Sequence, residues 1–212
     1  MPSMKSRIVN VDSLTPAQCK TMYALMEQYY DAMDFGRFRK DLADKDDVIL
    51  LLDGRSEEIK GFSTLKTVVL EKNGRRQYGL FSGDTVVDKA YWGQRVLGKA
   101  FLRYLFVQKA KRPLSPLYWV LISKGYKTYL LLANNFRVHY PRYEMKTSCA
   151  AQELLDGFGD SLFGSDYDSK TGLIVFEESL GQLKAGIADV PCDVSMANPR
   201  ISFFEKCNPT WM

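Results

Sequence analysis

Residues suited to phosphate binding cluster at the start of one predicted helix. The segment Gly83 to Arg112, GDTVVDKAYWGQRVLGKAFLRYLFVQKAKR, begins as a strand and ends as a basic amphipathic helix, expected from about Gly93 to Lys111. The first turn of a helix offers unpaired backbone N–H groups and the positive end of the helix dipole. Glycine lets a ligand approach the backbone, and the residues that supply this access and positive charge are Gly93, Gln94, Arg95, Gly98 and Lys99. The pattern is typical of a metal-independent phosphate site, although an ordinary strand-to-helix turn with a basic surface contains the same residue types.

Carboxylates before this helix and tyrosines after it could move protons. Asp84 and Asp88 are four residues apart, so both point to one face if their strand is regular. Either could act as a general base if burial raised its pKa, and either could equally be a structural carboxylate at a strand end. The tyrosines after the next predicted strand are Tyr126, Tyr129, Tyr140 and Tyr143, which are candidates for an acid or for aromatic packing.

The sequence does not favour a metal centre or a nucleophilic triad. His139 is the only histidine, and its polar context, RVHYPRY, is typical of a surface or hydrogen-bonding residue. The four cysteines are far apart, lack metal-ligand spacing and are expected to be reduced thiols of a cytoplasmic protein. The N-terminal segment MPSMKSRIVNV lacks an apolar secretory core, and the longest apolar runs are too short to span a bilayer.

Charge is distributed unevenly along the chain. Residues 89–146 contain 12 basic residues and one acidic residue, Glu144, whereas residues 151–212 contain four basic and 10 acidic residues. The middle segment is therefore expected to bind an anionic ligand or partner, or to be a solvated basic face balanced by the acidic tail. A nucleic-acid partner is disfavoured because no recognised nucleic-acid motif is present.

The pattern of elements places these residues in one mixed α/β domain. We expect a strand at SRIVNVDSL, then a helix that begins with Thr15 as its N-cap and Pro16 at its first position. A second short helix (FGRFRKDLADK) and a buried strand (DDVILLLDG) follow, and then two long strands joined at Asn73-Gly74. After the basic helix come a strand (LYWVLISKG) and a helix (YKTYLLLANNF), and then a helix over 148–164, a strand at GLIVFEE and a last short helix.

This order resembles the GCN5-related N-acetyltransferase superfamily, whose core runs strand, two helices, three strands, helix, strand, helix, strand. The family's cofactor loop has the form Arg/Gln-x-x-Gly-x-Gly/Ala, and Arg95-Val96-Leu97-Gly98-Lys99-Ala100 fits it. A second alignment sets VVDKAYWGQRVLGKAF against the family's valine-proline-Arg-Gly-x-Gly pattern, in which Trp92 stands where the arginine is expected. The resemblance covers roughly residues 6–146 and leaves 147–212 as a C-terminal extension, expected to pack on a 1–146 core.

The resemblance implies a mixed, mostly antiparallel sheet with helices on both faces and an acyl thioester between the fourth and fifth strands. It implies that acetyl-CoA or a longer acyl-CoA binds at Val87 and at the loop residues Gln94, Arg95, Val96, Leu97, Gly98 and Lys99. The acceptor is expected to be an amine, with Asp84 or Asp88 as base. The basic segment would also suit acyl carrier protein, which is acidic. The acyl donor could therefore equally be acyl carrier protein or coenzyme A.

The chain departs from the family pattern at its expected general acid. Leu131 stands where the family has a tyrosine that protonates the leaving thiolate, and Lys124 where it has an asparagine. Tyr140 or Tyr143 could supply the proton instead, whereas Tyr129 lies about 200° around the helix from the expected position. These departures keep open a second hypothesis, a binding module of this fold without catalysis.

Overall fold

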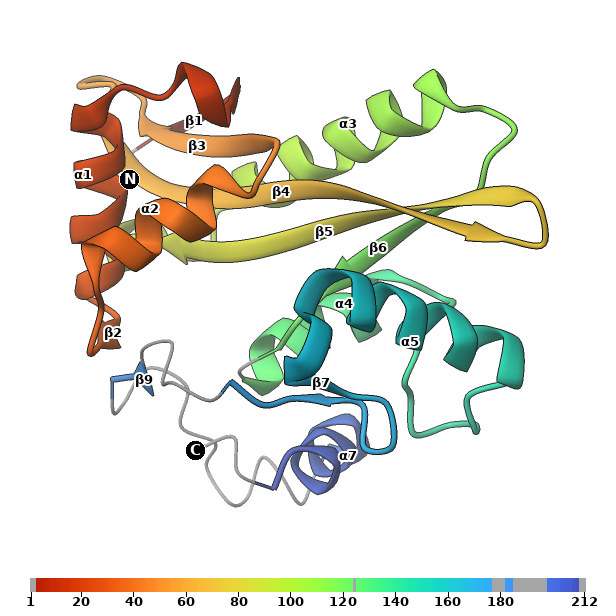
Figure 1. The fold of residues 1–212 in the computed structure, drawn as a ribbon. Coiled ribbons are helices and arrows are strands. Elements are labelled where there is room, and N and C mark those ends of the chain that lie inside the picture. Colours follow the sequence, from red (N-terminus) through yellow and green to blue (C-terminus); the bar gives the residue numbers. More distant parts are fainter. Residues whose placement is uncertain (1–2, 124, 177–181, 185–197, 210–212) are drawn as a thin grey trace. The chain divides into compact units, whose positions relative to one another are not determined.

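The computed structural model describes residues 3–123, 125–176, 182–184 and 198–209 (Figure 1). The chain divides into two compact units, residues 1–121 and 122–212. The expected core boundary at residue 146 falls inside the second unit. The packing of residues 147–212 against the core stays a prediction.

A five-stranded sheet forms the centre of the first unit. Its strands, in order across the sheet, are β1 (Met4–Asn10), β3 (Asp47–Asp53), β4 (Ile59–Lys72), β5 (Arg75–Val87) and β6 (Leu117–Leu121). All neighbouring pairs are antiparallel except β5 and β6, which are parallel. The predicted fold class, a mixed and mostly antiparallel sheet, is confirmed.

Three α-helices surround this sheet: α1 (Pro16–Glu27), α2 (Phe35–Ala43) and α3 (Val96–Lys111). A short strand, β2 (Tyr30–Asp31), and two 3-10 turns, η1 (Val11–Ser13) and η2 (Lys89–Tyr91), complete the unit. The predicted start of α1 is confirmed, because the Thr15 hydroxyl accepts the Gln18 N–H at 3.2 Å and the Gln18 side chain accepts the Thr15 N–H at 2.9 Å. This reciprocal capping satisfies two N–H groups at the helix start.

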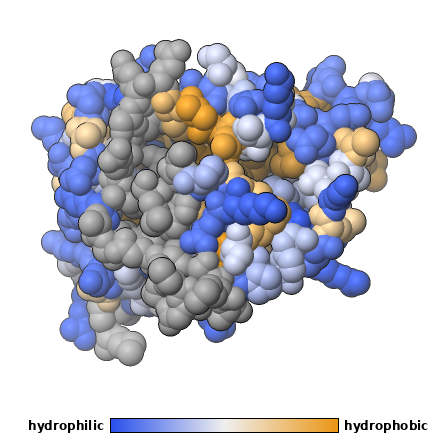
Figure 2. Space-filling model, turned by 90° about the horizontal axis from the view of Figure 1, so that it is seen from below, coloured by the Kyte–Doolittle hydropathy of each residue, from blue (hydrophilic) through white to orange (hydrophobic). Residues whose placement is uncertain are grey.

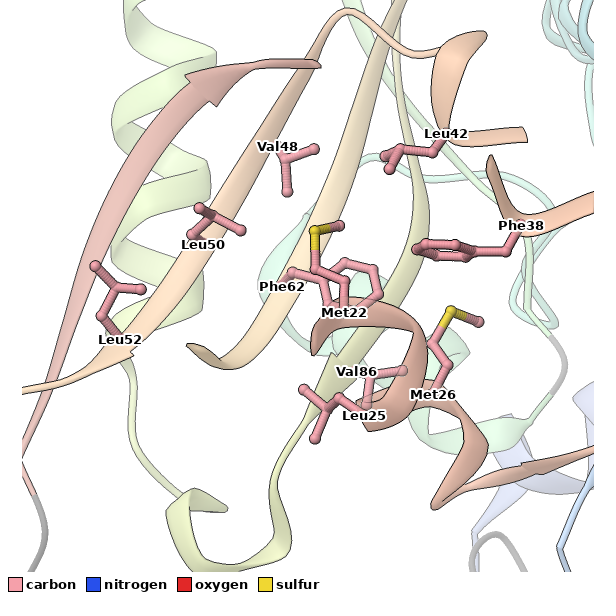
Figure 3. Packing of buried hydrophobic residues seen from close by; sticks show 10 residues of the cluster. All are labelled: Met22, Leu25, Met26, Phe38, Leu42, Val48, Leu50, Leu52, Phe62 and Val86. Atoms are coloured by element: carbon pink, nitrogen blue, oxygen red, sulfur yellow. The ribbon is translucent and has the colours of Figure 1, made fainter. Parts of the chain in front are cut away.

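Alternation along β3 assigns the helices to opposite faces of the sheet. Val48, Leu50 and Leu52 belong to a core cluster with residues of α1 and α2 (Figure 3). Ile49 and Leu51, on the other face, belong to a cluster with residues of α3. Since successive side chains of a strand point to opposite faces, the apolar run DVILLLD is buried on both sides.

The β4–β5 hairpin turns at Asn73-Gly74, as the sequence predicts. Both residues have positive φ, 51° and 69°. This conformation suits asparagine and glycine in a two-residue hairpin turn. The turn fixes the register of the two longest strands, from Lys72 opposite Arg75 outward.

The second unit contains α4 (Tyr126–Asn135), α5 (Cys149–Phe163) and α7 (Pro199–Cys207), with the 3-10 turn η3 (Gly164–Asp166). Its short strands are β7 (Tyr167–Asp168), β8 (Leu173–Ile174) and β9 (Gln182–Leu183). Tyr129, Ala133 and Phe204 form a small buried core between α4 and α7. The strand expected at GLIVFEE is present only as β8, and the last two residues of that segment lie outside the described residues.

Candidate active site

The end of β5 has an edge that β6 does not pair. The parallel pairing of β5 with β6 ends at Ser82 and Leu121, whereas β5 continues to Val87. On its other side, β5 stays paired with β4 as far as Val87 opposite Gly61. The stretch Gly83–Val87 therefore pairs with β4 on one side and extends beyond the last residue that β6 pairs on the other.

A bulge marks the start of the stretch that β6 does not pair. Gly83 and Asp84 together lie opposite Thr64, because the β4–β5 register shifts between Ser63 and Leu65. A Cβ on Gly83 would lie 2.6 Å from the Thr64 hydroxyl oxygen, so a side chain there would require Thr64 to move. Bulges bend a strand and turn its following residues. The bulge thus separates the part of β5 that pairs with β6 from the part that leads to the turn.

The turn after β5 delivers the chain to the N-terminus of α3. Asp88 caps η2 by accepting the Ala90 N–H at 2.9 Å. Gly93 has a φ of +83°, which side-chain-bearing residues rarely adopt. Because of this turn, α3 begins at Val96, three residues later than the sequence pattern predicts.

The first turn of α3 presents backbone donors in a basic setting, with Val96 and Leu97 partly buried and Gly98 exposed. Its N-cap, Arg95, makes no side-chain capping hydrogen bond, and the first turn has no acidic residue. The first N–H to bond back along the helix is that of Lys99, to the Arg95 carbonyl at 3.0 Å. The N–H groups of Val96, Leu97 and Gly98 precede it, and a Cβ on Gly98 would meet nothing within 4 Å. The space beside Gly98 is therefore open, which favours a close approach of a ligand to the backbone at that residue.

Two tyrosines anchor this turn to the rest of the unit. The Tyr29 hydroxyl accepts the Lys89 N–H at 2.7 Å, and the Tyr91 hydroxyl donates to the Asp53 carboxylate at 2.6 Å. The Tyr91 bond, helped by N–H groups of Ser56 and Arg55, lowers the pKa of Asp53. The same bond to Asp53 raises the pKa of Tyr91 to about 12. Both partners therefore keep their hydrogen-bonding forms throughout the neutral pH range.

The two predicted carboxylates occupy different settings. Asp84 lies in the bulge of β5, so the regular strand required for Asp84 and Asp88 to share a face is not present. Asp88 follows the last residue of β5 and uses one oxygen as a turn cap. Of the two, Asp84 lies on the strand itself, while Asp88 has the structural role that the sequence also allowed.

Tyr30 is a site residue that the sequence reasoning missed. It lies in β2, after α1, and burial together with the negative charge of Asp84 raises the pKa of its hydroxyl. Tyr30 and Asp84 are 54 residues apart in the sequence, so no local pattern indicates that the Asp84 charge acts on the Tyr30 hydroxyl. Only the fold brings these two residues into electrostatic contact.

The remaining predicted residues belong to the second unit. Tyr129 is buried and stacks on Phe204 at a centroid distance of 6.0 Å. Burial raises its pKa to about 12. His139 was expected at a surface or in a hydrogen bond; it is buried, and its Nδ1 lies 3.0 Å from the Phe136 carbonyl oxygen. Tyr143 is about half exposed. The Arg142 guanidinium lies over the Tyr140 ring, 5.8 Å from the ring centroid.

Other features of the described residues bear on the class of site. Within them, no group of three or more His, Cys, Asp or Glu side chains is arranged to hold a metal ion. No helix in the same part of the chain is long and apolar enough to cross a membrane. On the face seen in Figure 2, hydrophilic side chains cover most of the coloured surface and hydrophobic atoms show between them.

Comparison with known proteins gives matches only among solved structures. No protein-family model and no curated protein matches the sequence. An aminoglycoside N-acetyltransferase, AAC(6')-Iy in complex with CoA, is 12% identical with a TM-score of 0.49, over 70% of this chain and 97% of its own. An acetyltransferase from Trypanosoma brucei is 15% identical with a TM-score of 0.45, over 68% of this chain and 100% of its own. A ribosomal-protein-alanine N-acetyltransferase from Brucella melitensis biovar Abortus 2308 is 12% identical with a TM-score of 0.45, over 66% and 100%.

These likenesses are too distant to transfer a residue's role or a substrate to this chain. The order of the chain's own elements is the stronger observation: apart from the two-residue β2 and the 3-10 turns, it runs β1, α1, α2, β3, β4, β5, α3, β6, α4. As far as α4 this is the order that the sequence resemblance implies, with the basic loop between the fourth and fifth strands of the five-stranded sheet; α5 follows where the resemblance implies a strand. The chain has the fold of the GCN5-related N-acetyltransferase superfamily.

Proposed function

We propose that the chain is an acyltransferase that moves an acetyl or longer acyl group from a coenzyme A thioester to an amine. One observation carries the proposal: the unpaired edge of β5 leads, through a short turn, to the uncapped and basic N-terminus of α3. A phosphopantetheine arm has the matching order of groups, amides followed by phosphate. The same arm is carried by acyl carrier protein, which is an alternative donor for the basic segment.

The helix start would hold the phosphates. Backbone N–H groups of Val96, Leu97 and Gly98 point out of the first turn, and the helix dipole favours negative charge there. Arg95 and Lys99 add positive charge, and Gln94 adds a neutral donor. All of these residues are among those that the resemblance implies for cofactor binding.

The unpaired edge of β5 would hold the amide-containing arm. An extended chain with amide groups can add to an exposed strand edge through backbone hydrogen bonds. Thr85 and Val87 alternate with Val86, which pairs with Phe62 of β4. This pairing would place the thioester close to the bulge, where Asp84 lies.

The chain's own groups would then move the protons of acyl transfer. Asp84 is the proposed base for the amine, with Asp88 as the second candidate. Tyr140 and Tyr143 are the proposed donors to the departing thiolate. Tyr30 is a third candidate, because its hydroxyl is protonated at neutral pH and interacts electrostatically with Asp84. A backbone N–H at the β5 edge would polarise the thioester carbonyl.

A catalytically inactive binding module for an acyl-CoA is the second candidate. Leu131, which replaces the family's tyrosine, is 52% exposed on α4 and cannot donate a proton. The two functions predict the same ligand and different chemistry. Calorimetric titration with coenzyme A tests the binding, and release of free thiol from acetyl-CoA across a panel of amines tests the reaction.

Reversing the charge of Arg95 tests whether coenzyme A binds at the start of α3. Arg95 is exposed, so each unit of charge near it is worth about 1 kcal/mol at ~4 Å in a water-like dielectric. Arg95→Glu changes the charge by two units and should weaken coenzyme A binding at least about tenfold, roughly 1.4 kcal/mol. A glutamate at a helix start favours the helix, so unfolding would not explain the loss.

The matched control is Lys111→Glu, the same reversal at the other end of α3. A 16-residue helix is about 24 Å long, which exceeds the screening length of physiological salt. Lys111→Glu should therefore leave the affinity within about twofold. Equal effects of the two reversals would mean that coenzyme A does not bind at the start of α3.

A further inference from the structure

The Trp92 side chain is hydrogen-bonded to the carbonyl of the last residue of β5. Its indole Nε1–H donates to the Val87 carbonyl oxygen at 2.7 Å. Trp92 follows η2 and directly precedes Gly93, so it lies in the turn between β5 and α3. Its ring also lies near that of Tyr29, with a centroid distance of 6.3 Å.

The direction of the Val87 carbonyl follows from the β4–β5 ladder. The Asp88 N–H donates to the Lys60 carbonyl at 2.8 Å, so the backbone groups of Asp88 point toward β4. Backbone groups of successive strand residues point to alternate sides, and Val87 lies opposite Gly61 as a pair without mutual hydrogen bonds. The Val87 N–H and carbonyl therefore point away from β4, to the edge that β6 leaves unpaired.

An indole at this carbonyl and a ligand paired along the edge need the same space. Neighbouring extended chains lie about 4.8 Å apart. The indole nitrogen is 2.7 Å from the Val87 oxygen, which is the position that an N–H donor of a paired chain would take. An amide-bearing arm that pairs along the edge and donates to Val87 therefore competes with the indole for this position.

We propose that Trp92 is a gate on the β5 edge, which the pantetheine arm of the thioester donor displaces when it binds. This inference rests on the proposed function. The indole N–H holds the place of the ligand's amide N–H in the free protein, so that the hydrogen bond is exchanged on binding and Val87 stays satisfied. Trp92 is 48% exposed and is not part of the buried core, which allows its side chain to rotate away.

The gate separates ligands by their chemistry. Coenzyme A and pantetheine both carry the amide arm and must displace the indole. Adenosine 3′,5′-bisphosphate carries two of the three phosphates of coenzyme A and no arm, and would bind at the start of α3 with the indole in place. Trp92 therefore lowers the affinity of the first two ligands and not of the third.

Nuclear magnetic resonance of the ¹⁵N-labelled full chain tests the displacement directly. The Trp92 indole N–H signal is assigned by its loss in Trp92→Phe. Saturating pantetheine or coenzyme A should shift this signal and speed its exchange with water, whereas adenosine 3′,5′-bisphosphate should not. The Trp119 indole, which donates to Ser82 at 2.8 Å and packs on Phe101, is the internal control and should keep its exchange rate.

Trp92→Phe gives an independent measurement by calorimetric titration. It removes the competing N–H and keeps an aromatic ring beside Tyr29. Given the net worth of one hydrogen bond, coenzyme A and pantetheine should bind between about two- and tenfold more tightly. The affinity for adenosine 3′,5′-bisphosphate should not change.

The outcomes distinguish the gate from the function on which it rests. Coenzyme A that binds without moving the Trp92 signal, or that binds Trp92→Phe no more tightly, overturns the gate and leaves the acyltransferase proposal standing. A wild-type chain that binds neither coenzyme A nor pantetheine overturns both.

Discussion

Gly98 offers a test in which stability and ligand binding should move in opposite directions. It is the third residue of α3, and a Cβ placed on it would meet nothing within 4 Å. Replacing a helical glycine by alanine gains up to about 1 kcal/mol in a helix interior and less in the first turn. We therefore expect Gly98→Ala to raise the free energy of unfolding by about 0.5 kcal/mol, and the Tm by roughly 1–2 °C.

The same side chain should weaken coenzyme A binding. A phosphate oxygen accepting the Gly98 N–H must come within about 3 Å of its nitrogen. Added methyl groups obstruct this approach, and losing one hydrogen bond to a charged group costs about 1.5–3 kcal/mol. Gly98→Val should thus raise the dissociation constant by about 10- to 100-fold, and Gly98→Ala by less.

Calorimetric titration with coenzyme A and denaturant unfolding of the same variants measure both effects. Gly93→Ala is the matched control, because the φ of +83° at Gly93 makes a side chain there unfavourable by about 1–2 kcal/mol. It should lower stability, whereas Gly98→Ala should raise it. A folded Gly98→Val variant with wild-type affinity would refute the reasoning, and would favour the second alignment of the loop.

Three further predictions concern the proton donors, the turn and the extension. Tyr129→Phe should leave most thiol release from acetyl-CoA intact because Tyr129 is packed in the α4–α7 core, whereas Tyr140→Phe or Tyr143→Phe should reduce it; a large loss in Tyr129→Phe alone would contradict this. The pKa of Asp53 is lower in the folded chain, so its stabilisation is complete above the ordinary value of about 3.9 and is lost as the pH falls below it. Wild-type protein should therefore lose more free energy of unfolding than Tyr91→Phe between pH 6 and pH 3 in urea titrations, and equal losses would count against the Tyr91 bond. Limited proteolysis should not quickly release the C-terminal extension as a unit; a stable fragment ending near residue 146 would show that it does not pack on the core.

Much of the fold follows from local sequence patterns. The Thr15 cap and the Asn73-Gly74 turn depend on residues within a few positions of each other, so the sequence predicts both correctly. The apolar run of β3 indicates burial on both faces, and in the sheet the five central residues of β3 are buried. The order of these elements was sufficient to predict the fold class.

The candidate site is different, because its key features depend on long-range contacts. The sequence marks the loop as basic and rich in glycine, but α3 begins only at Val96 since Gly93 has a positive φ. The strand alternation that links Asp84 to Asp88 is broken by a bulge that depends on the pairing of β5 with Thr64 of β4.

The sequence by itself determined the element order, the basic helix start and the residues that we expect to bind an anion. Only the tertiary structure decided which groups meet at β5. The end of β6 at Leu121 leaves the last residues of β5 without that neighbour, the Asp84 charge acts on the Tyr30 hydroxyl, and the Trp92 indole donates to the Val87 carbonyl. These contacts depend on how far two strands pair and where a turn folds back, quantities set by packing across the sheet that no local pattern encodes.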